Sequence, residues 1–327
     1  MSVCLCLASA EKVLDLISYG FIEQFGLAGA DQLAACRATG DELRRLGSIP
    51  LDLGKPVHVL VPDRRWRTCK NGITSHTWGG KLSDGALISL GGGILAASPE
   101  FNAALEMRGR TPVARALILL SYCGVFAIDE GSEDGFIWRR PLTCIDRLWT
   151  FSRTIKGDPC SAALRDAVLL AGERCRSPLE ARLLLALTAP RFMGGLGLAM
   201  PRMNHRIDLS EEGRAIWGAD SIEGDMVWEA RKVDLEANGK LRHRGRFGED
   251  LTRASALESG GYSVRFATAR QLRSARQMLV LGRWLSEHLG CDAADLPERN
   301  RLQSLLNEIN SFNYHCISLD ELRRASR

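Results

Sequence analysis

Two acidic residues, Asp225 and Glu236, have the types and the spacing of a site for a divalent cation. They lie eleven residues apart on segments that the sequence predicts as consecutive strands, with residues 229–232 as the turn between them. Side chains directly opposite each other on antiparallel strands have Cβ atoms roughly 5 Å apart. Carboxylate oxygens are the ligands that Mg²⁺ or Mn²⁺ takes in proteins. We therefore predict a metal site with Asp225 and Glu236 as ligands.

The residues on either side of Glu236 alternate strictly between apolar and polar. Successive side chains of a strand point to opposite faces, so the apolar members are predicted to enter the core. The polar members would share the other face: Lys232, Asp234, Glu236 and Asn238. The same alternation is also typical of any half-exposed strand, so a solvated face without chemistry remains an alternative.

Basic residues follow this strand closely. Between residues 239 and 276, nine Lys and Arg oppose three acids, a local charge of +6 in a chain whose net charge is +4. Such a concentration is typical of a face that binds a polyanion, and a solvated set of helix faces is the alternative. The arginines predicted to contact a nucleic-acid backbone are Arg242, Arg244, Arg246 and Arg253.

His243 lies among these arginines, seven residues after Glu236. A metal ion that polarises a phosphate, a histidine that moves a proton and arginines that hold the backbone are what phosphodiester hydrolysis requires. Taken alone, His243 is equally compatible with an ordinary surface position.

The order of these motifs resembles that of the DUF559 domain, in the very-short-patch-repair-like branch of the restriction-endonuclease-like superfamily. The matching motifs are Asp225-Met226-Val227-Trp228, then Val233-Asp234-Leu235-Glu236-Ala237-Asn238-Gly239, then His243, Asp250-x-x-Arg253 and Gly261-Tyr262-Ser263-Val264. The resemblance covers residues 177–289, about a third of the chain. It implies a small mixed sheet flanked by helices, Asp225 and Glu236 as metal ligands, and His243 as a proton-transfer or phosphate-contacting group.

The resemblance also implies roles for three further residues. Glu180, in Ser177-Pro178-Leu179-Glu180, matches a glutamate that points into the active site, although S-x-x-E is equally a helix-capping box. Asn238 stands where the family commonly has a second acid, so it would contribute an oxygen ligand without charge. The usual lysine two residues after the glutamate is absent, and Lys232 is the candidate to replace it. These departures lead us to expect reduced nuclease activity or, alternatively, a non-catalytic DNA-binding regulator of the type IV antitoxin kind.

Upstream, a weaker resemblance connects the chain to AbiEi-antitoxin-like proteins. It rests on the apolar run 56–61, the basic loop after it and Ser98-Pro99-Glu100, which has the Ser and Pro of a helix start. It implies that this region binds DNA or a partner protein. The candidate phosphate contacts are Arg64, Arg65 and Arg67, with Trp66 able to stack on a base. An exposed basic turn is the alternative.

These elements predict a mixed α/β (α+β) protein. The expected organisation is a helical region at 1–55, a mixed α/β region at 56–158, the restriction-endonuclease-like domain at 177–290 and a C-terminal helical extension at 291–327. The function of the protein would be that of a nuclease, of a DNA-binding regulator, or of a protein–protein module without a nucleic-acid role.

The sequence also favours a cytoplasmic protein that does not enter membranes. The longest apolar stretch, Ala116 to Ile128, has 13 residues, whereas a spanning helix needs about 20. The N-terminus has no basic leader of the kind that begins a signal peptide. Ten cysteines without a C-x-x-C pair are expected to be reduced thiols rather than a zinc ribbon.

Overall fold

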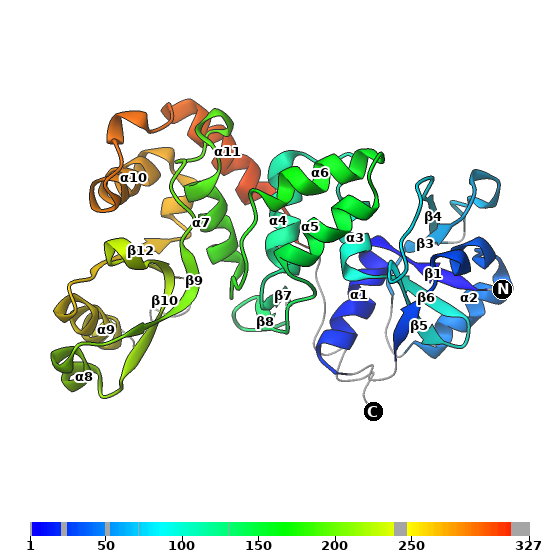
Figure 1. Ribbon diagram of the computed structural model, residues 1–327, viewed down its shortest axis with the longest axis horizontal. Coiled ribbons are helices and arrows are strands. Elements are labelled where there is room, and N and C mark those ends of the chain that lie inside the picture. The colour runs from blue at the N-terminus through cyan, green and yellow to red at the C-terminus, as the bar shows by residue number, and fades with distance from the viewer. Residues whose placement is uncertain are drawn as a thin grey trace. The chain divides into compact units, whose positions relative to one another are not determined.

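The chain folds into two compact units that each combine helices and sheet, which confirms the predicted mixed α/β class (Figure 1). Unit 1 comprises Met1–Leu169 with Tyr314–Arg327, and unit 2 comprises Leu170–Asn313. The computed structural model describes residues 2–20, 25–49, 53–70, 72–129, 131–238 and 247–314. Four residues predicted for the site lie outside these ranges: Arg242, His243, Arg244 and Arg246.

Unit 1 is built on a six-stranded mixed sheet with the order β2-β5-β6-β1-β3-β4. Strand β1 pairs in parallel with β6, and β3 pairs in parallel with β4, whereas the remaining pairs are antiparallel. The strands are β1 (Val3–Leu5), β2 (Gly26–Ala28), β3 (Val57–Val61), β4 (Ile73–Thr77), β5 (Leu87–Gly91) and β6 (Ile94–Ala97).

The helices of unit 1 begin with a repeated device. Three of them start with a Ser, Thr or Asp cap whose side chain accepts a backbone N–H, followed at once by proline: Ser98, Thr111 and Asp158. Proline lacks the N–H that the first turn would leave unpaired, so it favours this position. The helices are α1 (Leu7–Ser18), α2 (Gly40–Arg44), α3 (Pro99–Glu106), α4 (Pro112–Tyr122), α5 (Ile145–Thr154) and α6 (Pro159–Val168), with a hairpin of β7 (Phe126–Ile128) and β8 (Phe136–Trp138) after α4.

Unit 2 contains a four-stranded sheet with the order β12-β11-β10-β9. The chain runs antiparallel through β9, β10 and β11, and then crosses over through α9 to place β12 parallel to β11. The strands are β9 (Arg202–Asp208), β10 (Ser221–Trp228), β11 (Val233–Asn238) and β12 (Ser263–Thr268), and the helices are α7 (Pro178–Thr188), α8 (Glu211–Trp217), α9 (Phe247–Ser259), α10 (Ala275–Leu289) and α11 (Arg299–Ser311).

Helices α8 and α9 lie side by side and cover the sheet of unit 2 (Figure 1). A single apolar cluster joins α9 to strands β9 and β10. Its buried members are Ile207, Leu209, Ile222, Val227, Ala256 and Leu257. This cluster fixes α9 above the part of the sheet that carries the predicted acidic residues.

Two parts of the fold differ from the sequence prediction. The first 55 residues, expected to be helical, also supply β1 and β2, and β1 lies inside the sheet of unit 1. A three-residue strand has no periodicity to detect and exists only through its partners. Helix α8 was not predicted, although Ser210 caps its start and Gly218 ends it with a left-handed φ of 80°.

The described residues contain nothing that resembles a membrane span: no helix there has the length and apolar composition to cross a bilayer. The cysteines in the same ranges, nine in all, are free thiols.

A pair of histidines joins the parallel strands β3 and β4. His58 Nδ1 and His76 Nε2 are 2.9 Å apart, so one ring donates a proton to the other only while the acceptor is neutral. Burial lowers the pKa of both rings. For His76, burial and the charges of His58, Arg67 and Arg108 together lower the pKa to about 4. The nearby Glu106 acts in the opposite sense on the pKa of His58.

We predict that this pair makes unit 1 sensitive to acid. The unfolded chain binds protons with the ordinary histidine pKa of about 6.5, and the folded chain resists them until about pH 4. The contribution of the pair is therefore complete above pH 6.5 and is lost as the pH falls toward 4. Urea unfolding at pH 7.5, 5.5 and 4.5 should show wild type losing free energy of unfolding relative to His76→Gln. A difference that does not change with pH would contradict this.

Candidate functional site

The pairing of β10 with β11 brings the two predicted metal ligands together. Val227 pairs with Asp234 and Met226 with Leu235, and Asp225 and Glu236 are the next residues of β10 and β11 beyond these pairs. Asp225 reaches across the gap between the strands, where its Oδ2 accepts a hydrogen bond of 2.8 Å from the backbone N–H of residue 237. The carboxylates therefore come from adjacent strands, as predicted from their spacing.

Glu236 is held by an arginine from α9. The Nε and Nη2 of Arg253 donate to Glu236 Oε1 at 3.1 and 2.6 Å, and Nη2 also donates to the carbonyl of Glu223. Arg253 lies three and four residues before Ala256 and Leu257, so it shares the helix face that packs on the sheet. Its side chain is only 20% exposed. The predicted backbone-contacting arginine thus points inward, to a carboxylate.

Asp234 is the most buried acid of the site, with none of its surface exposed. Neither of its oxygens accepts a hydrogen bond from an N–H or O–H group of the described residues. Burial raises the pKa of Asp234 to about 6 and that of Glu236 to about 8, and the two carboxyl groups are close enough to share a proton. The alternative of a half-exposed strand face does not hold at Asp234 and Glu236, which are both buried.

Glu180, on α7, combines the two roles that the sequence left open. Its Oε1 accepts from Ser177 Oγ at 2.9 Å, and its Oε2 accepts from the Arg176 N–H at 2.9 Å and from Asn204 Nδ2 at 2.7 Å. Burial, together with the charge of Asp225, raises the pKa of Glu180 to about 7. The helix cap is thus also a member of the acidic group.

We call Glu180, Asp225, Asp234 and Glu236 the carboxylate cluster. Only one cation, Arg253, contacts it directly among the described residues. Nor does any set of three His, Cys, Asp or Glu in the described ranges converge in a geometry that would hold a metal ion. Its hard oxygen donors, together with Asp234, which has no N–H or O–H donor among the described residues, nevertheless have the chemistry of ligands for a divalent cation.

A glycine on β10 makes room for the buried acid. A Cβ at Gly224 would lie 2.5 Å from Asp234 Oδ1, closer than any real contact. Any side chain at this position would therefore displace the carboxyl group of Asp234.

Two further residues predicted for the site, Lys232 and Asn238, lie at the two ends of β11. Lys232 precedes β11 in a left-handed conformation, with φ of 50°, and its Nζ donates to the Gly260 carbonyl at 2.8 Å. Its ammonium group is therefore engaged at the C-terminal end of α9, and its predicted role as a replacement for the catalytic lysine stays a prediction. Asn238 ends β11 and is half-buried.

The basic turn of unit 1, Arg64 to Arg67, is exposed, which agrees both with a binding loop and with the alternative of an exposed basic turn. Asp63 caps its short 3₁₀ helix by accepting the N–H of Arg65 at 3.0 Å. The guanidinium of Arg37 lies 4.1 Å from the centre of the Trp66 ring, and that of Arg65 lies 5.7 Å from it. The sequence did not predict the contact of Arg37 with Trp66, because the two residues are 29 positions apart and no local pattern connects them.

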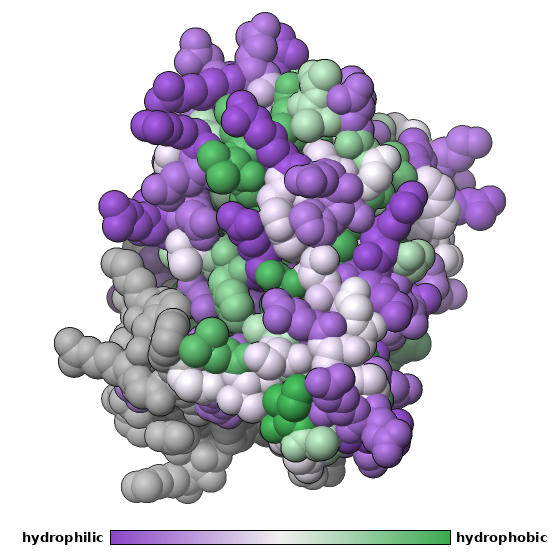
Figure 2. All heavy atoms as spheres, turned by 90° about the vertical axis from the view of Figure 1, so that its left-hand side faces the viewer, coloured by the Kyte–Doolittle hydropathy of each residue, from purple (hydrophilic) through white to green (hydrophobic). Residues whose placement is uncertain are grey.

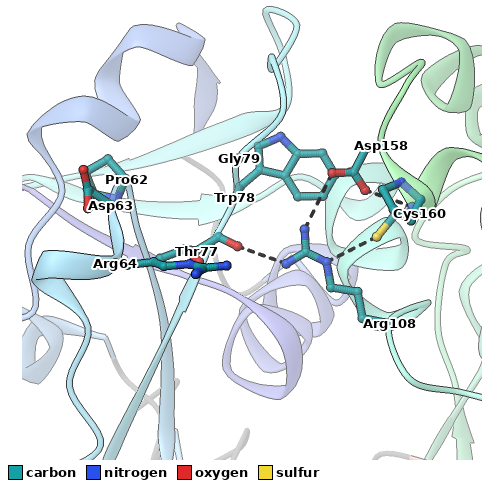
Figure 3. Close-up of a pocket in the computed structure, with 10 residues that line it drawn as sticks. Pro62, Asp63, Arg64, Thr77, Trp78, Gly79, Arg108, Asp158 and Cys160 are labelled. Atoms are coloured by element: carbon teal, nitrogen blue, oxygen red, sulfur yellow. Dashed lines mark hydrogen bonds and ion pairs between the residues drawn. The ribbon is translucent and has the colours of Figure 1, made fainter.

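A cavity of about 590 Å³ lies beside this turn, between the ends of β3 and β4 and the start of α6 (Figure 3). Its lining includes Arg64 and Arg108, but also Asp63 and Asp158. Arg108 donates to the Thr77 carbonyl at 3.0 Å and lies 3.8 Å from Asp158. Because its charges balance and Arg108 is engaged, we assign no ligand to this cavity.

The outer face of unit 2 does not gather its apolar side chains. Figure 2 shows small, separate apolar areas among hydrophilic side chains on this face. Exposed large apolar residues of α8, α9 and α10 are single ones on each helix: Ile216, Leu251 and Val280. Isolated exposed apolar residues are ordinary on a protein surface and indicate no docking patch.

Comparison with protein-family models, with curated proteins and with solved structures finds no match for this chain. Its function is therefore inferred from the residues and their contacts.

We predict that neutralising the buried acid stabilises the protein. Asp234→Asn keeps the shape of the side chain and removes an uncompensated buried charge, so in EDTA at pH 8 it should raise the free energy of unfolding by about 1–3 kcal/mol. The matched control is Asp208→Asn on β9, an acid that is 75% exposed and should change stability little. Denaturant unfolding measures both, and destabilisation by Asp234→Asn would show that its carboxylate has a compensating partner.

Proposed function

We propose that unit 2 is a metal-dependent nuclease that hydrolyses phosphodiester bonds, with DNA as its substrate. The observation that carries this proposal is the carboxylate cluster, in which Asp234 lies beside Glu236 and has no N–H or O–H donor among the described residues. Buried acids without compensation destabilise a fold, and they are concentrated at functional sites. The motif resemblance to the DUF559 domain supports the same chemistry.

The residues that would hold Mg²⁺ or Mn²⁺ are Asp225 and Glu236, with Asp234 as the third carboxylate and Asn238 as a neutral oxygen donor. When bound, the cation would polarise the phosphate and lower the pKa of an attacking water. Glu180, fixed by three hydrogen bonds, adds negative charge beside Asp225. His243 and the arginines around it, which lie outside the described residues, are the proposed proton carrier and backbone contacts.

The topology of unit 2 supports a restriction-endonuclease-like fold. Its sheet is small and mixed, α9 connects the two parallel strands, and α7 contacts β11 from another side. This is the arrangement that the resemblance implies, a small mixed sheet between helices, and it presents the carboxylates on the two central strands.

A second candidate is the non-catalytic DNA-binding regulator of antitoxin type, with or without a partner protein. One contact favours it: Arg253 already neutralises Glu236. Together with Asn238 in place of an acid, this would leave a charged core that has a structural role and no cation.

In either case the basic turn of unit 1 is the proposed second contact with nucleic acid. Arg64, Arg65 and Arg67 are exposed, and Trp66 holds Arg65 and Arg37 near its ring. A guanidinium that is ordered before binding loses less conformational entropy when it meets a phosphate.

We predict that two acids of the carboxylate cluster, Asp225 and Glu236, are required for cleavage. Asp225→Asn and Glu236→Gln keep the side-chain shape but remove ligand charge, so each should lower Mg²⁺-dependent cleavage of plasmid and single-stranded DNA at least about 100-fold. DNA affinity should change little. Asp208→Asn, exposed on the neighbouring strand, is the control and should cleave as wild type does.

The same assay separates the two candidates. Cleavage that survives in both variants would exclude this site as the catalytic centre. Salt-sensitive DNA binding without cleavage by the wild type would establish the regulator, and the absence of both would leave the protein–protein module.

We further predict that the basic turn contributes to DNA affinity electrostatically. The double variant Arg65→Gln/Arg67→Gln should weaken binding at low salt and reduce the slope of log affinity against log salt by about 1 for each lost contact. Arg153→Gln, an exposed arginine of α5, serves as the control. Equal slopes in all three proteins would show that the turn does not touch the backbone.

A further inference from the structure

We propose that Arg253 is the resident counter-ion of the carboxylate cluster and that a divalent cation binds by displacing it. This inference rests on the proposed function, because it concerns the same acids. It assigns to Arg253 a role that differs from its predicted one: in the cation-free protein it seals the site, and only after displacement is it available to a phosphate.

The contacts of Arg253 support this role. Its Nε and Nη2 converge on one oxygen, Glu236 Oε1, and Nη2 also bonds the Glu223 carbonyl on β10. The guanidinium therefore lies at the strand pair that carries the proposed ligands. A cation that took Glu236 as a ligand would compete for the oxygen on which Arg253 makes its two side-chain contacts.

Arg253 also leaves the cluster incompletely neutralised. One guanidinium faces Glu236 directly and acts on Asp234 and Asp225 through its charge. Both oxygens of Asp234 nevertheless remain without a donor among the described residues. A planar monovalent group on one carboxylate cannot also bond the next one on the strand, whereas a divalent cation coordinates oxygens from several carboxylates at once. The carboxylates could therefore bind a cation of higher charge than the guanidinium that Glu236 now contacts.

The position of Arg253 on α9 makes displacement feasible without unfolding the unit. The apolar face of α9 is anchored by Ala256 and Leu257, which are fully buried, one turn beyond Arg253. Arg253 itself retains 20% exposure, so its long side chain can turn outward while the helix stays packed. Next to a bound cation, an outward guanidinium would be placed to bind a phosphodiester oxygen.

The direct test is Mn²⁺ affinity in the absence of nucleic acid, measured by electron paramagnetic resonance of free Mn²⁺ with the full-length protein. If Arg253 occupies the site in more than nine molecules of ten, Arg253→Gln should bind Mn²⁺ at least about ten-fold more tightly than wild type. Arg253→Lys retains the charge but cannot make the forked contacts, so it should bind more tightly than wild type by a smaller factor. Arg206→Gln, which breaks an exposed pair with Asp208 in the same unit, should match wild type.

Three results of the Mn²⁺ titration would contradict the proposal. Equal or weaker Mn²⁺ binding by Arg253→Gln, with clear binding by wild type, would overturn the displacement while leaving the metal site in place. No Mn²⁺ binding by any of the proteins would overturn both the displacement and the metal-dependent function. Tightening in Arg253→Gln alone, with Arg253→Lys at the wild-type value, would show a general effect of charge and would also overturn the displacement.

Thermal unfolding provides a second readout that does not depend on catalysis. Mn²⁺ should raise the unfolding temperature of Arg253→Gln and Arg253→Lys more than that of wild type, because the cation replaces the counter-ion that those variants lack. This comparison remains possible if Arg253→Gln folds poorly without metal, since Arg253→Lys keeps a cation. An equal shift in all the proteins would contradict the displacement.

Discussion

The antiparallel pairing of β10 with β11 is the interaction on which the rest of unit 2 depends. It sets Asp234 opposite Val227, a member of the apolar cluster that anchors α9. The same hydrogen-bonded ladder that orders the sheet therefore also places two carboxylates, those of Asp234 and Glu236, in a poorly solvated region. The register that brings Val227 into the apolar cluster with Leu257 also buries acidic side chains.

Buried acidic charge has to be offset, and the offset here is partial. Arg253 compensates Glu236, three hydrogen bonds satisfy Glu180, and a backbone N–H satisfies one oxygen of Asp225, whereas Asp234 has no donor among the described residues. A purely structural core would be more stable with an apolar or amide residue in place of Asp234. Asp234 is thus a buried acid without a donor among the described residues, an arrangement that lowers the stability of the fold.

Local patterns were enough to predict the strands of unit 2 and the position of Asp225 and Glu236 on adjacent antiparallel strands, because alternation and turn length act over a few residues. They were not enough for the burial of Asp234 or the inward direction of Arg253, which depend on where α9 packs. The spacing of Arg253 to Ala256 and Leu257 was visible in the sequence, yet only the structure shows that this helix face meets the acidic strand. Arg37 beside Trp66 is a purely tertiary neighbour.

The departure from the DUF559 pattern that bears most on the proposed catalysis is Asn238, because that pattern commonly has an acid at this position. On a strand, residues two apart share a face, so Asp234 and Asn238 flank Glu236 symmetrically along β11. The acid missing on one side of Glu236 is thus matched by an acid on the other. The strand keeps two carboxylates on one face, Asp234 and Glu236. Under the proposed function, their charge would hold the cation at a shifted position. The activity of such a site depends on whether the cation, displaced with that charge, still reaches the phosphate, and not on the loss of one acid alone.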